Sequence, residues 1–191
     1  MQPSKQQLRQ KFQALRNKIS ARYREQAAFA AASLFANLPF FNAKYIACYL
    51  PTSQEFDTQP IIDLICKAKR HCYLPVINED KAIHFVRYQQ DAELLENEFS
   101  ILEPVERYEV IAPSQLDVVL MPLVAFDNYG HRLGMGGGYY DRTFNFLQDQ
   151  PRRKMKMIGV AFAQQQAEKI VSDPWDIKLD GVLTEKGFIK F

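Results

Sequence analysis

The sequence predicts one α/β domain over residues 1–191, with an open, mostly parallel sheet flanked by helices in three layers and a long N-terminal helix. Three observations support this fold class. Short apolar runs typical of strands alternate with segments of helical periodicity. The most apolar run, VVLMPLVA within residues 117–125, lacks polar alternation, as expected for a strand buried on both faces. A length of 191 residues fits a single domain.

Residues 4–37 predict either one long helix or two consecutive helices. Ser4 can cap the first turn, and Gln7 three residues later completes a capping box. Pro39 ends the segment. Apolar side chains recur at helical spacing and mark the buried stripe: Leu8, Phe12, Leu15 and Ile19.

The remaining elements follow in alternating order. Strands are predicted over residues 44–50, 71–77, 83–88, 117–125, 156–162, 181–184 and 188–190. Helices are predicted over residues 58–70, 139–148 and 164–169, the first of them capped by Thr58. The polar stretch 91–116, with its acids and prolines, predicts mostly loop with short helical pieces.

Composition narrows the possible functions. Charged residues make up 24% and the net charge is +2, which excludes a strongly basic nucleic-acid coat protein and an acidic disordered chain. Residues 1–36 nevertheless carry seven basic side chains and one acid. We expect no membrane span and no secretory signal, because apolar stretches are too short. Three cysteines without metal-binding spacing are typical of reduced thiols in a cytoplasmic protein.

A glycine-rich loop carries the strongest functional signal. Five of the chain's eight glycines fall within the nine residues 130–138, after the buried strand and before a predicted helix. Glycine allows positive φ and close approach of the backbone to a ligand, and amides at a helix start attract anions. Arg132 and Arg142 can neutralise phosphate charge, and His131 could touch it. Asp141, expected to be an exposed loop acid, could hold a metal ion.

Two familiar phosphate loops do not fit this segment. GxxxxGK[ST] is absent, and the dinucleotide pattern GxGxxG that begins at Gly134 meets Tyr139 at its third glycine position. This argues against an oxidoreductase on a dinucleotide-binding fold. A merely flexible turn is also disfavoured, because so many glycines cost backbone entropy without any return in packing. The sequence therefore predicts a phosphate loop of another kind.

The segment from Pro122 to Asp141 resembles the signature of the 5-formyltetrahydrofolate cyclo-ligase (5,10-methenyltetrahydrofolate synthetase) family, P-x-x-A-F-D-x-x-G-x-R-L-G-x-G-x-G-Y-Y-D. The resemblance spans nearly the whole chain. The family's Lys-x-x-x-Arg appears near the N-terminus, its Leu and later Glu follow the first strand, and its D-x-x-L-D-x-V-x-T-E ends the match at residues 176–185. Two loop positions depart from some members, which carry Lys at Gly137 and Arg at Met135.

The resemblance implies an ATP-driven ring closure. ATP would phosphorylate the formyl oxygen of 5-formyltetrahydrofolate, with or without a polyglutamate tail. The neighbouring amine would attack the imidoyl phosphate, giving 5,10-methenyltetrahydrofolate, ADP and phosphate. The resemblance also implies Mg²⁺ and a sheet like that of the sugar-isomerase and CoA-transferase group. We expect a monomer that binds neither nucleic acid nor a membrane.

Site residues follow from the resemblance position by position. ATP would be held by Lys5, Arg9, Arg132, Leu133, Gly134, Met135, Gly136, Gly137, Gly138, Tyr139 and Tyr140. The folate would contact Leu50, Glu55, Met135, Gly136, Gly137, Gly138 and Tyr139. Mg²⁺ would be bound by Asp141 and Asp176. Catalytic roles would fall to Arg132, Tyr139 and Asp141.

An alternative interpretation is a non-catalytic nucleotide- or RNA-binding module that uses the basic N-terminal helix. On sequence alone, Lys5 and Arg9 are typical of solvated helix charges as well as of ligands. Such a module would bind RNA with a steep dependence on salt. The near-neutral total charge argues against it.

Overall fold

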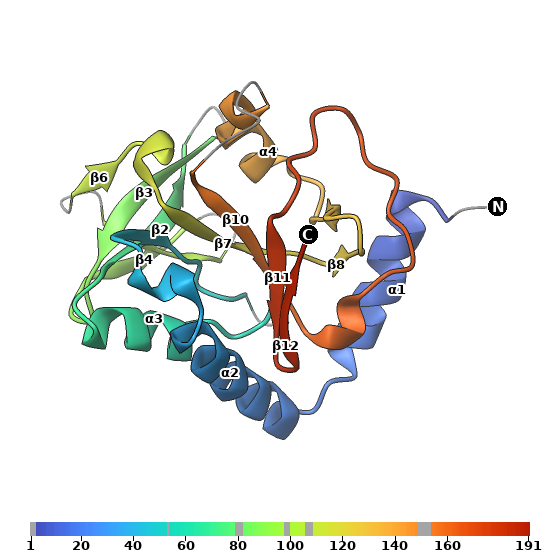
Figure 1. Ribbon diagram of the computed structural model, residues 1–191, viewed down its shortest axis with the longest axis horizontal. Coiled ribbons are helices and arrows are strands. Elements are labelled where there is room, and N and C mark those ends of the chain that lie inside the picture. The colour runs from blue at the N-terminus through green and yellow to red at the C-terminus, as the bar shows by residue number, and fades with distance from the viewer. Residues whose placement is uncertain (1–2, 53, 79–81, 98–99, 106–108, 149–153) are drawn as a thin grey trace.

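An eight-stranded sheet forms the centre of the computed structural model, which describes residues 3–52, 54–78, 82–97, 100–105, 109–148 and 154–191 (Figure 1). In spatial order the strands are β12 (Gly187–Lys190), β11 (Gly181–Thr184), β10 (Lys156–Val160), β7 (Val118–Pro122), β1 (Tyr45–Ala47), β2 (His71–Ile77), β3 (Ile83–Tyr88) and β6 (Val110–Ile111). The strands from β11 to β2 run parallel, while antiparallel pairs form both edges. The predicted α/β fold is confirmed.

Helices cover both faces of the sheet. α2 (Ala21–Ala36) and α3 (Gln59–Lys67) lie on one face, and α4 (Tyr139–Thr143) lies on the other (Figure 1). A short 3-10 turn, η1 (Pro39–Asn42), links α2 to β1. None of the helices in the described part of the chain has the length and apolar character that crossing a membrane requires.

Successive residues of β7 face opposite layers. Val118 and Leu120 pack in the cluster that contains α2 and α3, whereas Val119 and Met121 pack with Phe144 beyond α4. Both faces of the strand are therefore buried. This burial explains the absence of polar alternation in the sequence of this run, and the prediction from that pattern is confirmed.

The N-terminal segment forms two consecutive helices, α1 (Lys5–Asn17) and α2, rather than one long helix. The predicted capping box of Ser4 and Gln7 begins α1. Ser20 then begins α2, because its side chain accepts a hydrogen bond from the amide of Tyr23. A serine that satisfies a free amide in this way favours a helix start over a helix interior.

α1 packs on a different part of the molecule from α2 and α3. It lies beside the hairpin of β8 (Ala125–Phe126) and β9 (Arg132–Leu133), and against the 3-10 turn η4 (Ala163–Gln165) (Figure 1). Its buried Leu8 and Phe12 pack with Leu133 and Ile170. Since the glycine-rich segment follows β9 directly, this packing places α1 next to it.

Some predicted helical segments are shorter or absent. The helix expected over residues 139–148 is divided into α4 and the 3-10 turn η3 (Asn145–Leu147), and only η4 stands where a helix over 164–169 was expected. Residues 149 and 150 lie outside the described residues. Thr58 stands at the predicted N-cap position of α3, but its side chain makes no capping hydrogen bond. Its hydroxyl donates to the Tyr49 carbonyl, and Asp57 Oδ1 accepts the amide of Gln59 instead.

The polar stretch 91–116 contains short strands in place of most of the expected helical pieces. β4 (Leu94–Glu96) pairs with β5 (Leu102–Pro104), and β6 pairs with β3 at the sheet edge. The 3-10 turn η2 (Pro113–Gln115) is a single short helical turn. Backbone pairing with β3 and between β4 and β5 decides these strands, and the polar composition of the stretch does not predict it.

The strand order reverses between β1 and β7. The chain leaves β1 for β2 on one side, and later occupies β1's other side with β7. In open parallel sheets, ligands bind at the carboxyl ends of the strands beside such a reversal. Leu50 follows β1 and Leu123 follows β7, so these residues mark the expected place of a site.

Candidate active site

One cavity of about 950 Å³ opens where the topology predicts a site, next to the residues that follow β1 and β7. Its lining includes every residue that the sequence predicted for ATP, folate, metal or catalysis: Lys5, Arg9, Leu50, Glu55, Arg132, Leu133, Gly134, Met135, Gly136, Gly137, Gly138, Tyr139, Tyr140, Asp141 and Asp176. The fold thus brings together side chains up to 171 positions apart in the sequence. Their individual roles stay predictions.

The loop after β1 forms the wall that carries Leu50 and Glu55. The amide of Thr52 donates to Glu55 Oε2 at 3.0 Å, which holds the carboxylate within its own loop. Tyr49 is buried, and its hydroxyl donates to the Phe56 carbonyl at 3.2 Å. Burial and the charge of Glu55 raise the pKa of Tyr49 well above its ordinary value, so the phenol stays neutral. This wall therefore offers one ionisable acceptor beside apolar surface.

The glycine-rich segment has a conformation that side chains would disturb. Gly136 has a φ of +107° and Gly138 a φ of +68°, in the region that favours glycine. Arg9 Nε donates to the Gly134 carbonyl at 2.8 Å, and a Cβ on Gly136 would lie 3.5 Å from Arg9 Cζ. A Cβ on Gly137 would lie 2.4 Å from the ring of Tyr139. Gly136 and Gly138 are therefore required by the backbone conformation of this segment.

Arg132 and Asp141 form a partly buried ion pair. Arg132 Nη2 donates to Asp141 Oδ1 at 2.7 Å, and its Nη1 donates to the Ile177 carbonyl. The Ile177 amide donates in turn to Asp141 Oδ1 at 3.0 Å. The expectation that Asp141 is an exposed loop acid is wrong, because its side chain is 24% exposed and holds the 6% exposed side chain of Arg132.

Lys5 forms a second ionic corner of the cavity. Its Nζ lies 2.7 Å from Asp173 Oδ2 and 2.8 Å from Asp176 Oδ2. Burial alone would lower the pKa of Lys5, but hydrogen bonds and charges of the two aspartates outweigh it and raise the pKa. Burial would likewise raise the pKa of Asp176, but hydrogen bonds from Lys5 and from the Asp173 amide, with the nearby positive charges, hold it below its usual value.

Asp141 and Asp176 fit magnesium as oxygen donors. Asp141 uses Oδ1 for its described contacts and Asp176 uses Oδ2, so in each carboxylate the other oxygen is left for a ligand. The described residues include no cluster of three or more His, Cys, Asp or Glu placed to hold a metal. Mg²⁺ commonly binds one or two carboxylates together with substrate phosphates and waters. The donor set therefore suits a metal that arrives with a nucleotide.

Comparison with known proteins settles the family. A sequence model described as the 5-formyltetrahydrofolate cyclo-ligase family matches residues 1–185. The chain belongs to this family. It is 40% identical over 158 residues to a 5-formyltetrahydrofolate cyclo-ligase of Escherichia coli K12, covering 81% of this chain and 85% of that protein. A relative of the same name from Haemophilus influenzae is 34% identical over 183 residues, covering 94% of this chain and 96% of that protein.

Solved structures agree with this membership of the 5-formyltetrahydrofolate cyclo-ligase family. The NMR structure of Aquifex aeolicus 5,10-methenyltetrahydrofolate synthetase superposes with a TM-score of 0.83 at 34% identity, covering 97% of this chain and 92% of that one. The corresponding synthetase from Mycoplasma pneumoniae shares the fold, with a TM-score of 0.75 at 24% identity over 96% of this chain and 99% of that one. This chain is accordingly an enzyme of the ligase class.

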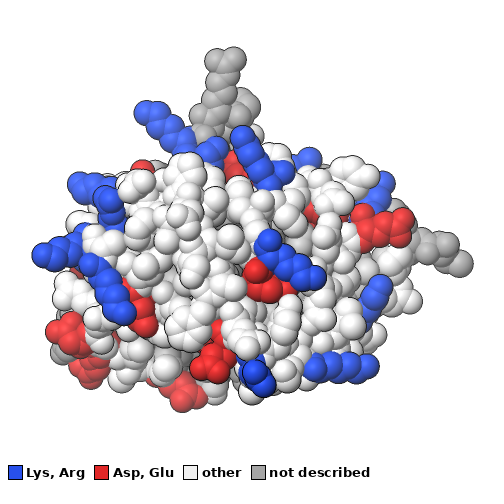
Figure 2. Space-filling view, turned by 60° about the horizontal axis from the view of Figure 1, so that its bottom comes forward, with Lys and Arg blue, Asp and Glu red and all other residues white. Residues whose placement is uncertain are grey.

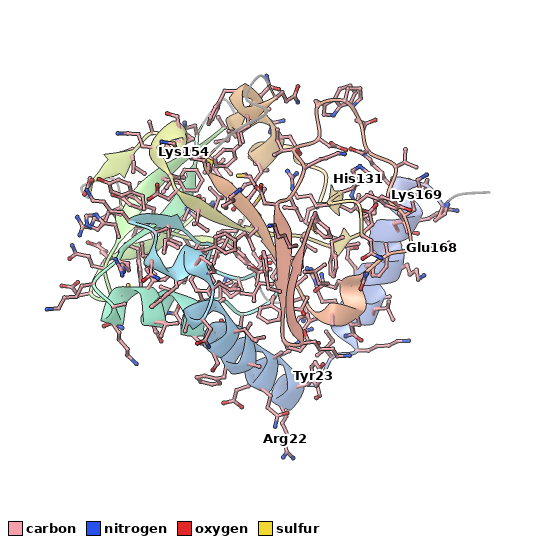
Figure 3. The ribbon with its side chains drawn as sticks, viewed as in Figure 1. Arg22, Tyr23, His131, Lys154, Glu168 and Lys169 are labelled. Atoms are coloured by element: carbon pink, nitrogen blue, oxygen red, sulfur yellow. The ribbon has the colours of Figure 1, made fainter. Side chains whose placement is uncertain are left out.

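Two residues of the cyclo-ligase signature segment have a structural explanation in this chain. Asp127 is fully buried and accepts hydrogen bonds from the amides of Tyr129, His131 and Ile170. His131 Nδ1 lies 3.0 Å from Asp127 Oδ2, so its ring binds Asp127 at the β8–β9 hairpin (Figure 3). His131 is not part of the cavity lining, and the expectation that it touches phosphate is not supported.

Sequence reasoning missed three charged residues that line the cavity of this cyclo-ligase family member: Arg16, Glu103 and Asp173, the last of which is the ion-pair partner of Lys5 described above. Glu103 of β5 accepts the amide of Ile77 at 3.0 Å and Asn97 Nδ2 at 2.8 Å, and its stretch had been predicted as loop. Arg16 of α1 is buried, although nearby Leu15 was the side chain expected to face the core. The helical spacing from Arg9 to Arg16 was the one signal that could have found it.

Proposed function

We propose that this protein converts 5-formyltetrahydrofolate, with or without a polyglutamate tail, to 5,10-methenyltetrahydrofolate, using ATP and Mg²⁺ and releasing ADP and phosphate. One observation carries the proposal: the glycine-rich segment, the cations Lys5 and Arg9, and the acceptor Glu55 line the same cavity. A phosphoryl transfer between two bound substrates needs such a shared cavity, because the reacting atoms must approach within about 3.5 Å.

The two substrates would occupy different walls. The phosphates of ATP would lie against residues 134–138, beside Lys5 and Arg9, where glycine lets a ligand approach the backbone closely. The folate ring would lie against Leu50 and Glu55, whose carboxylate can accept ring N–H groups. The volume of about 950 Å³ is at the upper end of the range for small-molecule sites, as two substrates require.

In the proposed reaction, the formyl oxygen attacks the terminal phosphorus of ATP, and the bond to ADP breaks. The imidoyl phosphate so formed carries an activated carbon. The neighbouring amine nitrogen attacks that carbon and loses its proton, and phosphate leaves with the former formyl oxygen. The protein contributes mainly positioning and neutralisation of charge, since phosphoryl transfer needs little covalent chemistry from side chains.

The cations of the cavity would divide this work. Arg132 would position Asp141, because both of its terminal nitrogens already bind protein groups. Lys5 and Arg9 would neutralise phosphate charge from α1. Arg142, whose Nη2 donates to the Gly137 carbonyl at 2.6 Å, would supply the cation that other family members provide through Lys at position 137. Tyr139 would pack against the folate from the start of α4.

Mg²⁺ would be held by the remaining oxygens of Asp141 and Asp176 together with the phosphates of ATP. When bound, such an ion neutralises the charge that develops on the transferred phosphoryl group. Asp141 would contribute through its contact with the ion, and its ion pair with Arg132 would fix the direction of the carboxylate.

A coupled assay tests this proposal. Purified protein with ATP, Mg²⁺ and 5-formyltetrahydrofolate should show a rise in methenyl absorbance and an equal release of phosphate. Both signals should require all three components, and a chelator of divalent ions should remove both. Unchanged absorbance with every component present would contradict the proposal.

The RNA-binding alternative has less support. Lys5 is ion-paired and Arg9 binds the glycine-rich segment, so neither lies on a free basic surface. On the face shown in Figure 2, Lys and Arg side chains are scattered among Asp and Glu rather than gathered in one patch. RNA binding measured in a salt titration should be negligible, and a steep salt dependence would favour the alternative.

A further inference from the structure

Arg16 is a buried cation of the cavity without an ion-pair partner among the described residues. The residue is 5% exposed, and its Nε makes no hydrogen bond within the described structure. Lys5 and Arg132, in contrast, are ion-paired to aspartates. A buried charge without a partner is costly, so its presence in a ligand cavity indicates that a ligand supplies the missing acceptor.

Arg16 lies at the folate wall rather than at the glycine-rich segment. It follows Arg9 by seven residues, which places it about 10 Å further along α1 on nearly the same face. Burial lowers the pKa of Arg16, and the charges of Glu55 and Tyr49 oppose that lowering. Arg16 lines the same cavity as Tyr49 and Glu55, and Arg24 bonds both the Arg16 carbonyl and Gln54, so Arg16 lies beside the loop after β1.

Arg24 of α2 fixes Arg16 relative to Glu55. Arg24 Nη2 donates to the Arg16 carbonyl and, at 2.8 Å, to Gln54 Oε1, while Nη1 donates to the Gln54 carbonyl at 3.1 Å. One side chain thus ties the end of α1 to the residue that precedes Glu55. The backbone positions that carry the cation and the carboxylate are therefore held relative to each other.

A pterin edge is complementary to this pair. It carries in order an amino group on C2, an N–H at N3 and a carbonyl oxygen on C4, so two donors are followed by an acceptor. A carboxylate only accepts hydrogen bonds and a guanidinium only donates them. Resting on the function proposed above, we propose that Glu55 binds the 2-amino and N3–H groups while Arg16 binds the 4-oxo oxygen, and that this pair selects 4-oxo folates over 4-amino analogues.

The selection has a simple physical basis. In a 4-amino analogue, a donor replaces the oxygen that faces Arg16, and N3 loses its hydrogen. The contact of Arg16 with the 4-oxo oxygen and the contact of Glu55 with N3–H are then both lost, and the guanidinium remains buried without an acceptor. A site built around hydrogen bonds strongly rejects a ligand that leaves its buried polar groups unpaired. This rejection is much stronger than that of an apolar pocket for a ligand that lacks one methylene.

Binding measurements without ATP test the selection. Calorimetry would compare 5-formyltetrahydrofolate with its 4-amino counterpart on the wild type, on Arg16→Gln and on the control Arg22→Gln, whose exposed side chain points away from the molecule (Figure 3). The wild type and the control should prefer the 4-oxo ligand by at least about a hundredfold. Arg16→Gln should lose about tenfold or more of this preference. An unchanged preference in Arg16→Gln would overturn the inference.

Stability separates this role from a structural one. Arg16→Met removes an unpaired buried charge and keeps most of the apolar stem, so the Tm of the unliganded protein should stay constant or rise. A marked fall of Tm in both Arg16→Met and Arg16→Gln would show that the side chain holds the fold, and would also overturn the inference.

Kinetics distinguish the two substrates. In Arg16→Gln the KM for the folate should rise, while the KM for ATP should stay within about twofold. A rise confined to ATP would place Arg16 at the phosphates and refute its assignment to the ring. A wild type that neither binds nor converts 5-formyltetrahydrofolate would refute the proposed function, whereas an active wild type with unaltered selectivity in Arg16→Gln would refute this inference alone.

Discussion

The carboxylate of Asp141 has two hydrogen-bond partners among the described residues and, in the proposed reaction, a third partner in the metal ion. Its Oδ1 accepts hydrogen bonds from Arg132 and from the Ile177 amide. These contacts join the β8–β9 hairpin, the start of α4 and the segment before β11. A single residue therefore contributes to stability through one oxygen and would contribute to catalysis through the other.

Two substitutions separate these contributions. Asp141→Asn should abolish Mg²⁺-dependent turnover but cost only about 1 kcal/mol of unfolding free energy, because the amide oxygen can still accept both hydrogen bonds. Asp141→Ala should cost about 3 kcal/mol, because it leaves the buried Arg132 without its ion-pair partner. Urea unfolding and phosphate release would be measured on both variants. Wild-type turnover in Asp141→Asn would remove Asp141 from the metal site, and equal stability losses would refute the structural role of the ion pair.

Among the elements, the glycine-rich segment owes its shape to particular glycines. Gly136 combines a φ of +107° with close packing against Arg9, whereas a Cβ added to Gly134 would have nothing within 4 Å, and Gly134 has no positive φ. Two glycines two positions apart are therefore subject to different constraints. The constraint on Gly136 is conformational and does not depend on a bound ligand.

This difference makes a matched pair of substitutions. Gly136→Ala should destabilise the protein by about 1–3 kcal/mol, since a side chain at this φ is strained. Gly134→Ala should change stability by less than about 0.5 kcal/mol. Thermal unfolding without ligands would compare them. Equal effects of the two substitutions would show that backbone strain at Gly136 does not determine the shape of the segment.

The contact between α1 and residues 173–176 should depend on pH. The pKa of Asp176 is lowered in the folded protein, so its contribution to stability is present above about pH 4 and is lost as the pH falls through the folded pKa. Because Asp176 is paired with Lys5 near the surface, that contribution should be about 1 kcal/mol. The pKa of Lys5 is raised, so its own contribution persists until strongly alkaline pH.

Urea unfolding of the wild type and of Asp176→Asn would measure this effect. The pH would be varied from about 3 to about 7, because this range spans the ordinary aspartate pKa of about 3.9. The difference in unfolding free energy should be largest near neutral pH and shrink toward pH 3. Asp91→Asn, which changes an exposed aspartate, is the control and should show little difference at any pH. A constant difference for Asp176→Asn across the range would contradict the assignment.

At the scale of the whole molecule, one sheet with two covered faces carries the stability. The two large clusters of buried residues meet at the parallel strands, and β7 contributes to both. The candidate cavity lies at the carboxyl ends of these strands, so its walls rest on the buried sheet. We infer that the chain unfolds as one domain.

Leu120→Ala tests this inference, because Leu120 is fully buried in β7. The substitution should cost about 2–5 kcal/mol and shift a single cooperative transition. Leu95→Ala, at a 57% exposed leucine of β4, is the matched control and should cost less than about 0.5 kcal/mol. Circular dichroism and tyrosine fluorescence would follow unfolding in urea. Two separate transitions would contradict a single domain.

Much of the fold and of the site could be predicted because the deciding features are local in the sequence. Strands β2, β3 and β11 have the predicted bounds, since their apolar runs and flanking turns are recorded in consecutive residues. The glycine-rich segment could be found in the same way. The family signature then supplied Lys5, Arg9 and Glu55, which no local pattern distinguishes from solvated charges.

Other features depend on which distant segments meet. The strands of residues 91–116 form because they find partners in β3 and in each other. Arg16 is buried because α1 packs on the cavity, and its helical spacing from Arg9 was the one sequence signal that pointed to this position. Asp141 is an ion-pair partner because the hairpin brings Arg132 to the start of α4.

The sequence by itself determined the fold class, the family and many of the residues that line the cavity, because periodicity, glycine spacing and a long signature are properties of neighbouring positions. Only the tertiary structure decided which charges are paired, and that Arg16 is buried without an ion-pair partner among the described residues. Arg9 and Gly134 are 125 positions apart, yet they share a hydrogen bond. Pairing and burial of charge depend on distances in space, and those distances exist only once the sheet, α1 and the glycine-rich segment have come together.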